Sequence, residues 1–263
     1  MWYPGGVPPG PTIRLLLGRD HETLGALDVV AVSPHTACVL AAGADGAYDP
    51  AAAKTHPNED ALLVIEDARH TVLAVADAHF GREASEELLT LLRDALLPVP
   101  ENPERLAAVF ARLAAARPPS RHGSETTLAV CILDRLFRQA FGLAFGDSSV
   151  MRMAPGADPL LVHERSQEFV SAADPPSLDP RGAQRFAFSP ARGELLLVFT
   201  DGVNECCYRD PDRSLTAERM GELLRTGPSD APAVVETLAR AALEGVGGHA
   251  GGEDNVALAV TVV

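Results

Sequence analysis

Four aspartates at the ends of strongly apolar runs could together bind a cation. They occur in Asn58-Glu59-Asp60, Val75-Ala76-Asp77-Ala78-His79, Thr200-Asp201-Gly202 and Glu253-Asp254-Asn255. A strand that ends in a carboxylate brings that charge to the rim of a sheet, where several carboxylates can share divalent cations instead of repelling one another. The pattern therefore indicates a metal site and points to an enzyme.

Each aspartate taken alone also has an ordinary structural interpretation. Asp77 could cap a helix that begins near Ala84. Asp201 and Asp254 are followed by Gly202 and Asn255, and both dipeptides are common in turns. Only the combination of the four favours chemistry over local structure.

Composition agrees with a cation site and excludes other classes of partner. The chain has 263 residues, 46% of them hydrophobic, which is enough for one large core. Its formal charge of −14 argues against nucleic acid, because phosphate contacts need clustered Lys and Arg. Lys54 is the only lysine, so a catalytic lysine is excluded elsewhere.

The cysteines and the amino terminus predict a cytoplasmic protein. Cys38, Cys131, Cys206 and Cys207 contain no C-x-x-C pair, so neither a zinc ribbon nor a disulfide framework is indicated. Adjacent Cys206 and Cys207 are interpreted as packing residues. The first residues lack the basic and apolar regions of a signal peptide, and no apolar run approaches the roughly 18 residues of a membrane span.

Periodicity outlines the elements that must position the aspartates. Residues 1–27 are expected to form a partly disordered arm, which begins rich in Pro and Gly, ahead of a main domain at 28–263. Short apolar runs predict strands at residues 29–32, 38–42, 62–65, 72–76, 126–133, 139–145, 194–200 and 256–263. Helical spacing predicts helices at residues 82–97, 103–116, 216–224 and 231–243. Residues 154–193, rich in Pro, Gly and Asp, are expected to form a flap-like insertion.

The order of these elements predicts the fold class. A helix pair separates two runs of strands, which differs from the strict strand–helix alternation of a doubly wound sheet. We expect an α+β fold in which two packed, largely antiparallel sheets are flanked by helices, an α-β-β-α sandwich.

In order along the chain, the acidic motifs resemble those of the metal-dependent protein serine/threonine phosphatases, the type 2C family, in a bacterial form. The matching blocks are Asn58-Glu59-Asp60-Ala61, Val75-Ala76-Asp77-Ala78-His79-Phe80-Gly81, Gly123-Ser124-Glu125-Thr126-Thr127, Phe145-Gly146-Asp147-Ser148, Leu197-Val198-Phe199-Thr200-Asp201-Gly202 and Asp254-Asn255-Val256. Six blocks in family order are far more specific than any one of them.

The resemblance implies hydrolysis of phosphoserine or phosphothreonine in proteins by a hydroxide that bridges two divalent cations, Mg²⁺ or Mn²⁺. By position, Asp60 matches the bridging carboxylate, and Asp77 and the Ala78 carbonyl match ligands of the same pair. Asp201 and Asp254 match ligands of the second ion. Asp147 matches a residue of a weaker third ion.

The resemblance also implies roles for two neighbours of these ligands. Glu59 would hold a metal-bound water. His79 matches the histidine that protonates the leaving oxygen, a role that an imidazole titrating near neutrality can fill. Its alternative is a structural histidine.

The chain departs from the family pattern in three places. Ala78 and Phe80 replace glycines, so Ala78 would be strained if its φ were positive. Thr55 stands where the family places a phosphate-binding arginine, which leaves Lys54 or His56 as the expected phosphate contact, although Lys54 could equally be a solvated loop residue. Ser149 stands where the family often has arginine.

These features predict a protein phosphatase that acts on a phosphoprotein, opposes a Ser/Thr kinase and is monomeric, with no nucleic acid or membrane partner. Two alternatives stay open. One is a pseudophosphatase that binds phosphoproteins or metals without turnover. The other is a stress-regulator phosphatase dedicated to one regulatory protein.

Overall fold

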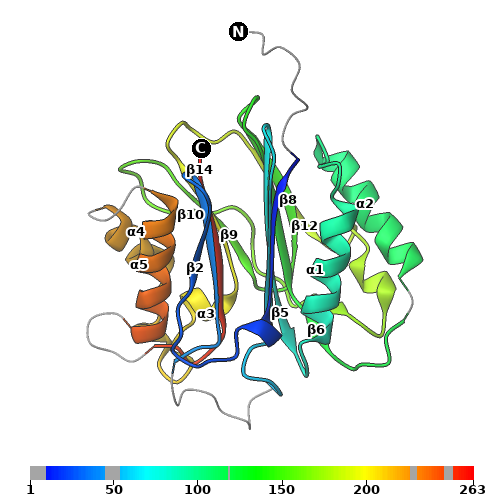
Figure 1. Cartoon of the computed structure of the whole chain (residues 1–263), viewed down its shortest axis with the longest axis horizontal. Helices are drawn as coiled ribbons and strands as arrows, with labels where there is room; N and C mark the ends of the chain where they lie inside the picture. The colour runs from blue at the N-terminus through cyan, green and yellow to red at the C-terminus, as the bar shows by residue number, and fades with distance from the viewer. Residues whose placement is uncertain (1–9, 45–53, 118, 226–229, 246–250) are drawn as a thin grey trace.

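Two β-sheets lie face to face with helices on both outer sides in the computed structural model of the chain (Figure 1). The structure describes residues 10–44, 54–117, 119–225, 230–245 and 251–263. Every strand pair within these ranges is antiparallel. The expected α+β sandwich of two antiparallel sheets flanked by helices is confirmed.

The first sheet has eight strands. Its main path runs, in spatial order, through β1 (Thr12–Leu17), β4 (Asp60–Glu66), β5 (His70–His79), β7 (Leu128–Asp134), β8 (Gln139–Phe145) and β12 (Gln184–Phe188). Two short strands, β6 (Glu125–Thr126) and β11 (Val170–Ser171), extend from the end of β5. The central strands are nearly continuous apolar runs because both of their faces are covered.

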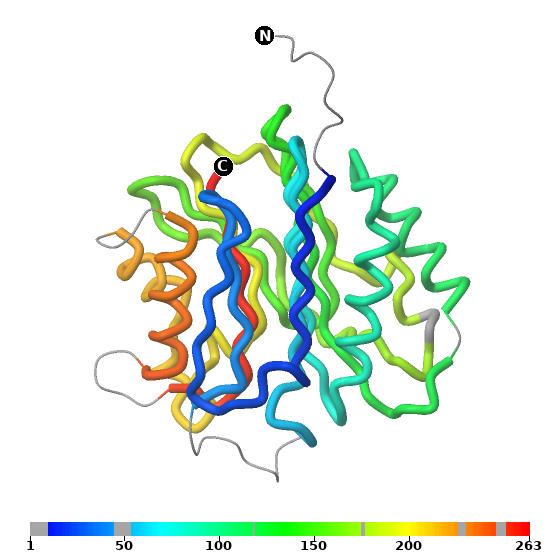
Figure 2. The backbone as a smooth tube through the Cα atoms, viewed as in Figure 1, coloured from blue at the N-terminus to red at the C-terminus, as the bar shows by residue number. Residues whose placement is uncertain are grey.

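The second sheet has six strands. Their spatial order is β10 (Leu160–Leu161), β9 (Ser149–Met153), β13 (Leu195–Phe199), β14 (Val256–Val262), β3 (Thr36–Ala41) and β2 (Val29–Ser33). The last strand of the chain, β14, therefore lies between β13 and the early strand β3. Figure 2 shows this neighbouring pair as a red and a blue segment side by side.

Helices cover the two outer faces. α1 (Glu83–Ala95) and α2 (Pro103–Ala116) pack on the first sheet, whereas α4 (Ala217–Arg225) and α5 (Ala231–Glu244) lie beside the second (Figure 1). The side chains of Asn102 and Asp230 cap α2 and α5 by accepting backbone N–H bonds from Arg105 and Ala233. The short α3 (Asp201–Asn204) follows β13 directly, and single 3-10 turns occur at Gly18–Asp20, Pro175–Leu178 and Pro211–Arg213.

Alternating side chains divide the core into three layers. Leu62, Val64 and Val75 point between the sheets, where they meet Leu40 and Val198 of the second sheet. The intervening residues of the same strands point outward to α1 and α2. This burial of both faces fixes the strand register, since a slip of one residue would exchange the two layers.

Two expectations about irregular segments need correction. Residues Thr12–Leu17 of the expected arm form β1, which pairs with β4 over its whole length, because Ile13, Leu15 and Leu17 pack beside α1. The expected flap at 154–193 contributes β10, β11 and β12 to the sheets. It is therefore better described as a series of short edge strands with connecting turns.

Among the described residues, no helix is long and apolar enough to cross a membrane.

Candidate metal centre and active site

Asp60 and Asp77 come from neighbouring strands of the first sheet. Asp60 begins β4, and Asp77 lies near the end of β5 as its direct partner in the strand register. Both are buried, at 0% and 1% exposed. The backbone N–H groups of Asp60 and Asp77 donate to Asn58 Oδ1 at 3.1 Å and to Thr127 Oγ1 at 3.0 Å, which fixes both strand ends.

Asp201 and Asp254 come from the facing end of the second sheet. Asp201 begins α3 just after β13, and Asp254 precedes β14. Carboxylate oxygens of Asp77, Asp201 and Asp254 lie within 4.8 Å of one another, close enough to share one ion. Thr200 Oγ1 donates to Asp60 Oδ2 at 2.8 Å, so a hydrogen bond joins the two sheets at this point.

In the motif Asp201-Gly202, the glycine is required for steric reasons. A Cβ atom at Gly202 would lie 1.8 Å from the carbonyl oxygen of Asn255, which no side chain could tolerate. The glycine therefore allows α3 to approach the start of β14 closely. This approach brings Asp201 next to Asp254.

Several carboxylate oxygens in this cluster have no hydrogen-bond donor. Asp60 Oδ1, Asp77 Oδ2 and Asp201 Oδ1 are buried and unpartnered. A buried polar atom without a partner costs roughly 1–3 kcal/mol, and more if it is charged. Oxygens of Asp77 and Asp201 also lie, with one of Asp254, within 4.8 Å of one another, and carboxylate oxygens are the ligands that a hard divalent cation prefers. The residues present therefore fit a Mg²⁺ or Mn²⁺ ion.

The ionisation of the aspartates reflects their crowding. Burial, and then the charge of Asp77, raise the pKa of Asp60 well above its usual range. Burial and the charges of Asp77 and Asp254 do the same for Asp201. Burial also opposes ionisation of Asp77, but the nearby charges of Lys54 and His79 outweigh it and lower its pKa. Asp77 is therefore the member that most readily stays charged.

Solved structures of protein phosphatases share this arrangement of strands and helices. The PP2C phosphatase domain of SpoIIE from Bacillus subtilis, solved with a fragment of its regulatory domain, superposes with a TM-score of 0.62 at 16% identity, covering 90% of this chain and 63% of that chain. The chain has the fold of the PP2C-type phosphatases.

Two further structures with the PP2C-type fold match over nearly their whole length. The PPM Ser-Thr phosphatase MsPP from Mycobacterium smegmatis has a TM-score of 0.57 at 17% identity, covering 87% of this chain and 97% of that one. RsbX, in complex with magnesium, has a TM-score of 0.56 at 12% identity, covering 90% and 100%. No protein-family model and no curated protein sequence matches the chain.

Lys54 lies inside the acid cluster, away from any open phosphate groove. Its Nζ donates to Asp77 Oδ1 and, at 3.4 Å, to the carbonyl of Ala78. It also lies 3.3 Å from Asp254 Oδ1 and 3.8 Å from Asp60 Oδ1. Burial alone would lower its pKa, but the charges of the surrounding aspartates raise it well above the usual value.

Glu59 organises the segment that carries Lys54. Its Oε1 accepts bonds from Thr55 N at 2.6 Å, Thr55 Oγ1 at 2.9 Å and His56 N at 2.9 Å. Its Oε2 accepts a bond from Gly81 N at 3.3 Å. Both carboxylate oxygens of Glu59, which the resemblance assigns to a metal-bound water, thus accept bonds from backbone or Thr55 groups.

His79 lies at the exposed side of the cluster. Its Nε2 is 4.0 Å from Asp77 Oδ2, and its side chain is 25% exposed. The ring meets Phe169 edge-on, with 5.4 Å between centroids. His79 is thus held by an aromatic neighbour and remains within reach of both solvent and the acid cluster.

The two replaced glycines behave differently. Ala78 is an ordinary strand residue of β5, so the expected strain at Ala78 does not arise. Phe80 instead has φ of +61° and leaves its ring 58% exposed. A positive φ costs a non-glycine residue about 1–2 kcal/mol, so the chain stabilises this turn in another way. The Gly81–Glu59 contact is one such restraint.

Asp147 stands beside the cluster on the loop after β8. Burial, and then the charge of Asp77, raise the pKa of Asp147. The following residue, Ser148, shares a 2.6 Å hydrogen bond with Thr127, which in turn holds Asp77 N. The structure therefore brings all six expected metal-binding residues to one end of the sandwich.

Tyr208 is a site residue that sequence analysis did not identify. Its hydroxyl contacts Asp201 Oδ2 at 2.8 Å and Asp254 Oδ2 at 2.5 Å. Burial and the charges of Asp254 and Asp201 raise its pKa far above the usual value, so the hydroxyl stays protonated. Tyr208 therefore links the carboxylates of Asp201 and Asp254.

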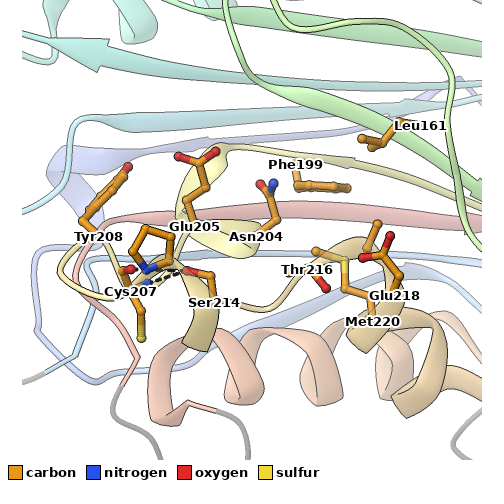
Figure 3. A pocket seen from close by; sticks show the side chains of 12 residues that line it. Leu161, Phe199, Asn204, Glu205, Cys207, Tyr208, Ser214, Thr216, Glu218 and Met220 are labelled. Carbon is orange, nitrogen blue, oxygen red and sulfur yellow. Dashed lines mark hydrogen bonds between the residues drawn. The ribbon is translucent and has the colours of Figure 1, made fainter.

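A pocket of about 560 Å³ adjoins Tyr208. Figure 3 shows Tyr208 at one end of it and Leu161, Glu218 and Met220 at the other. Cys207 also lines the pocket. Its backbone N–H donates to Ser214 Oγ, and its carbonyl accepts a bond from the same hydroxyl. Burial raises the pKa of Cys206 to about 11 and raises that of Cys207, so both are protonated thiols.

Proposed function

We propose that this protein is a metal-dependent phosphatase that removes phosphate from serine or threonine in a protein substrate. The observation that carries the proposal is the set of buried, unpartnered oxygens on Asp60, Asp77 and Asp201. A fold shared with PP2C-type phosphatases supports it, as does a magnesium complex of one such structure. A divalent cation bound there would polarise the phosphate and lower the pKa of a water.

The chain's own residues then have separable tasks. Asp77, Asp201 and Asp254 would hold the cation, with Thr200 and Tyr208 keeping neighbouring carboxylates in place. Asp60 and the Ala78 carbonyl would supply further oxygens at this end of the sandwich. Asp147 would supply another from the loop after β8. These residues come from both sheets, so the sandwich itself orients the site.

His79 is the group that would protonate the leaving serine or threonine oxygen. It lies beside the cluster, is partly exposed, and its ring orientation is restrained by Phe169. Because Lys54 binds carboxylates and Thr55 binds Glu59, His56 keeps the expected role of contacting the substrate phosphate. The proposed substrate is a cytoplasmic phosphoprotein that an opposing Ser/Thr kinase has modified. The proposed enzyme acts on it as a monomer.

One observation favours the pseudophosphatase alternative. Lys54 binds oxygens that a cation would otherwise use. A protein in which the ammonium fully replaced the metals would bind phosphoproteins without turnover. A phosphatase dedicated to one regulatory protein differs only in substrate, and selectivity among whole phosphoproteins would identify it.

Hydrolysis of a chromogenic phosphomonoester and of a phosphopeptide, measured with EDTA, Mg²⁺ and Mn²⁺ in turn, tests the proposal. Turnover should require a divalent cation and should be abolished in Asp201→Asn and Asp254→Asn, each of which loses a ligand charge. Asp94→Asn, on an exposed helix position, is the matched control. Turnover in EDTA, or near wild-type turnover in either ligand variant at modest metal concentration, would contradict it.

A further inference from the structure

Lys54 contacts some oxygens of the acid cluster and leaves others without a hydrogen-bond donor. Its ammonium contacts Asp77 Oδ1, Asp254 Oδ1 and the Ala78 carbonyl, with Asp60 Oδ1 at 3.8 Å. The side chain is only 12% exposed. By resemblance, Asp60 is the carboxylate that bridges two cations, and Asp77 and the Ala78 carbonyl are ligands of the same pair. Lys54 therefore lies against ligands of that pair.

The segment around Lys54 holds it in this place. The next two residues, Thr55 and His56, are bonded to the buried carboxylate of Glu59 through two N–H groups and a hydroxyl. Glu59 is bonded in turn to Asn255, beside Asp254. A buried ammonium is stable only when it is paired and hydrogen-bonded, and here three carboxylates and a carbonyl provide that pairing.

The remaining oxygens suit one divalent cation. Asp77 Oδ2 and Asp201 Oδ1 are buried and have no hydrogen-bond donor. Asp254 contacts Lys54 through one oxygen and Tyr208 through the other, and it joins Asp77 and Asp201 in offering three oxygens within 4.8 Å of one another. Asp77 can use one carboxylate oxygen for Lys54 and the other for a metal ion.

We propose that the Lys54 ammonium takes the place of one of two cations, so that this protein binds a single divalent cation at Asp77, Asp201 and Asp254. The inference rests on the proposed metal-dependent function and refines it. Four aspartates supply four negative charges, which one ammonium and one divalent ion nearly balance. With the ammonium in place, a second divalent ion would leave an excess of positive charge, so it could bind only by displacing Lys54 from its carboxylate partners.

Mn²⁺ binding to the full chain, measured by titration calorimetry, tests this inference without any activity assay. Wild type should bind one ion. Lys54→Met, which keeps an unbranched apolar side chain but removes the ammonium, should bind two. Arg192→Met removes the same charge from an exposed position and should bind one, as wild type does.

The number of ions bound distinguishes the role of Lys54 from the proposed metal-dependent function. Two ions in both wild type and Lys54→Met, or one ion in both, would overturn the role of Lys54 while leaving a metal-dependent enzyme intact. No ion in any variant would overturn both. Circular dichroism of each variant establishes that it is folded before its stoichiometry is counted.

A second measurement needs only the wild-type protein. Because Lys54 is the sole lysine, mass spectrometry of its peptide after reductive methylation reports on this one side chain. If the ammonium and the metal ion share the site, Lys54 should stay protected at saturating Mn²⁺ and react only when urea unfolds the chain. Faster modification as Mn²⁺ is added would show displacement and contradict the inference.

Discussion

Asp60 and Asp77 stand directly opposite each other in the register of β4 and β5. Both side chains are buried, and the charge of Asp77 is a main cause of the raised pKa of Asp60 after burial itself. Like charges at directly opposed positions destabilise a sheet. The pair is therefore a cost to the fold, which the Lys54 ammonium and a bound divalent cation would offset.

Neutralising one member of this pair should stabilise the protein in the absence of metal. Asp60→Asn keeps an oxygen that can accept the Thr200 hydroxyl bond but removes the charge. We expect a free energy of unfolding in EDTA that is higher by about 1 kcal/mol, because the opposed charges are no longer both present. Thermal melts in EDTA and in Mn²⁺ measure it.

The same variant should gain less than wild type when Mn²⁺ is added, since it has lost a carboxylate near the ion. Asp158→Asn, on an exposed side chain, should show neither effect. An Asp60→Asn protein that is less stable than wild type in EDTA would contradict this prediction.

The sequence predicted the convergence of the aspartates because strand ends are visible as the limits of apolar runs. Antiparallel packing of two sheets then places such ends together, and Asp60, Asp77, Asp201 and Asp254 follow from that rule. β1 was missed because its short run, Thr12–Leu17, follows a Pro- and Gly-rich start that favoured a loose arm.

Lys54 and Tyr208 could not have been placed in this way. Each belongs to a connecting segment, and its long side chain reaches the cluster from outside the strands. No spacing rule fixes where such a side chain points. Tyr208 follows Cys206 and Cys207 in an irregular stretch after α3, and only the folded backbone shows its hydroxyl between Asp201 and Asp254.

Loss of the His79 imidazole should depend on the leaving group. A general acid typically contributes about 10²–10⁴-fold, and it matters most when the leaving oxygen is strongly basic. His79→Ala should therefore slow hydrolysis of a phosphopeptide far more than that of an aryl phosphate. Steady-state kinetics on both substrates measure the ratio, with His122→Ala, at an exposed position, as control. Equal losses on both substrates would remove His79 from that role.

Removal of the Tyr208 hydroxyl should lower the stability of the metal-free protein. Tyr208→Phe leaves Asp201 Oδ2 and Asp254 Oδ2 without this donor, and a buried acceptor without a partner costs about 1–3 kcal/mol. We expect a lower melting temperature in EDTA that Mn²⁺ partly restores, because a cation can bind the released oxygens.

A double-mutant cycle makes the Tyr208 prediction specific. If the hydroxyl acts through Asp254, the destabilisation by Tyr208→Phe should be smaller in an Asp254→Asn background than in wild type. Strictly additive effects of the two changes on the free energy of unfolding would show that the Tyr208 hydroxyl does not act through Asp254.

His163 should make the fold sensitive to mild acid. Val150 N donates to its Nε2 at 3.2 Å, while Nδ1 lies 2.8 Å from the carbonyl of Glu164, an arrangement that requires the neutral ring. The ring also stacks on Phe186, with 5.8 Å between centroids. Burial, assisted by the charge of Arg165, lowers the pKa of His163 below its ordinary value of about 6.5.

A histidine with a lowered pKa in the folded state contributes stability that is complete above pH ~6.5 and is lost as the pH falls through its folded pKa. Wild type should therefore lose stability as the pH falls below about 6.5, with a contribution from His163 of at most about 1.4 kcal/mol per pH unit. His163→Gln retains an acceptor for Val150 N but cannot gain a proton, so its stability should decline less over this range. Urea unfolding of wild type, His163→Gln and the exposed control His122→Gln at several pH values measures the difference, and parallel curves for wild type and His163→Gln would contradict the assignment.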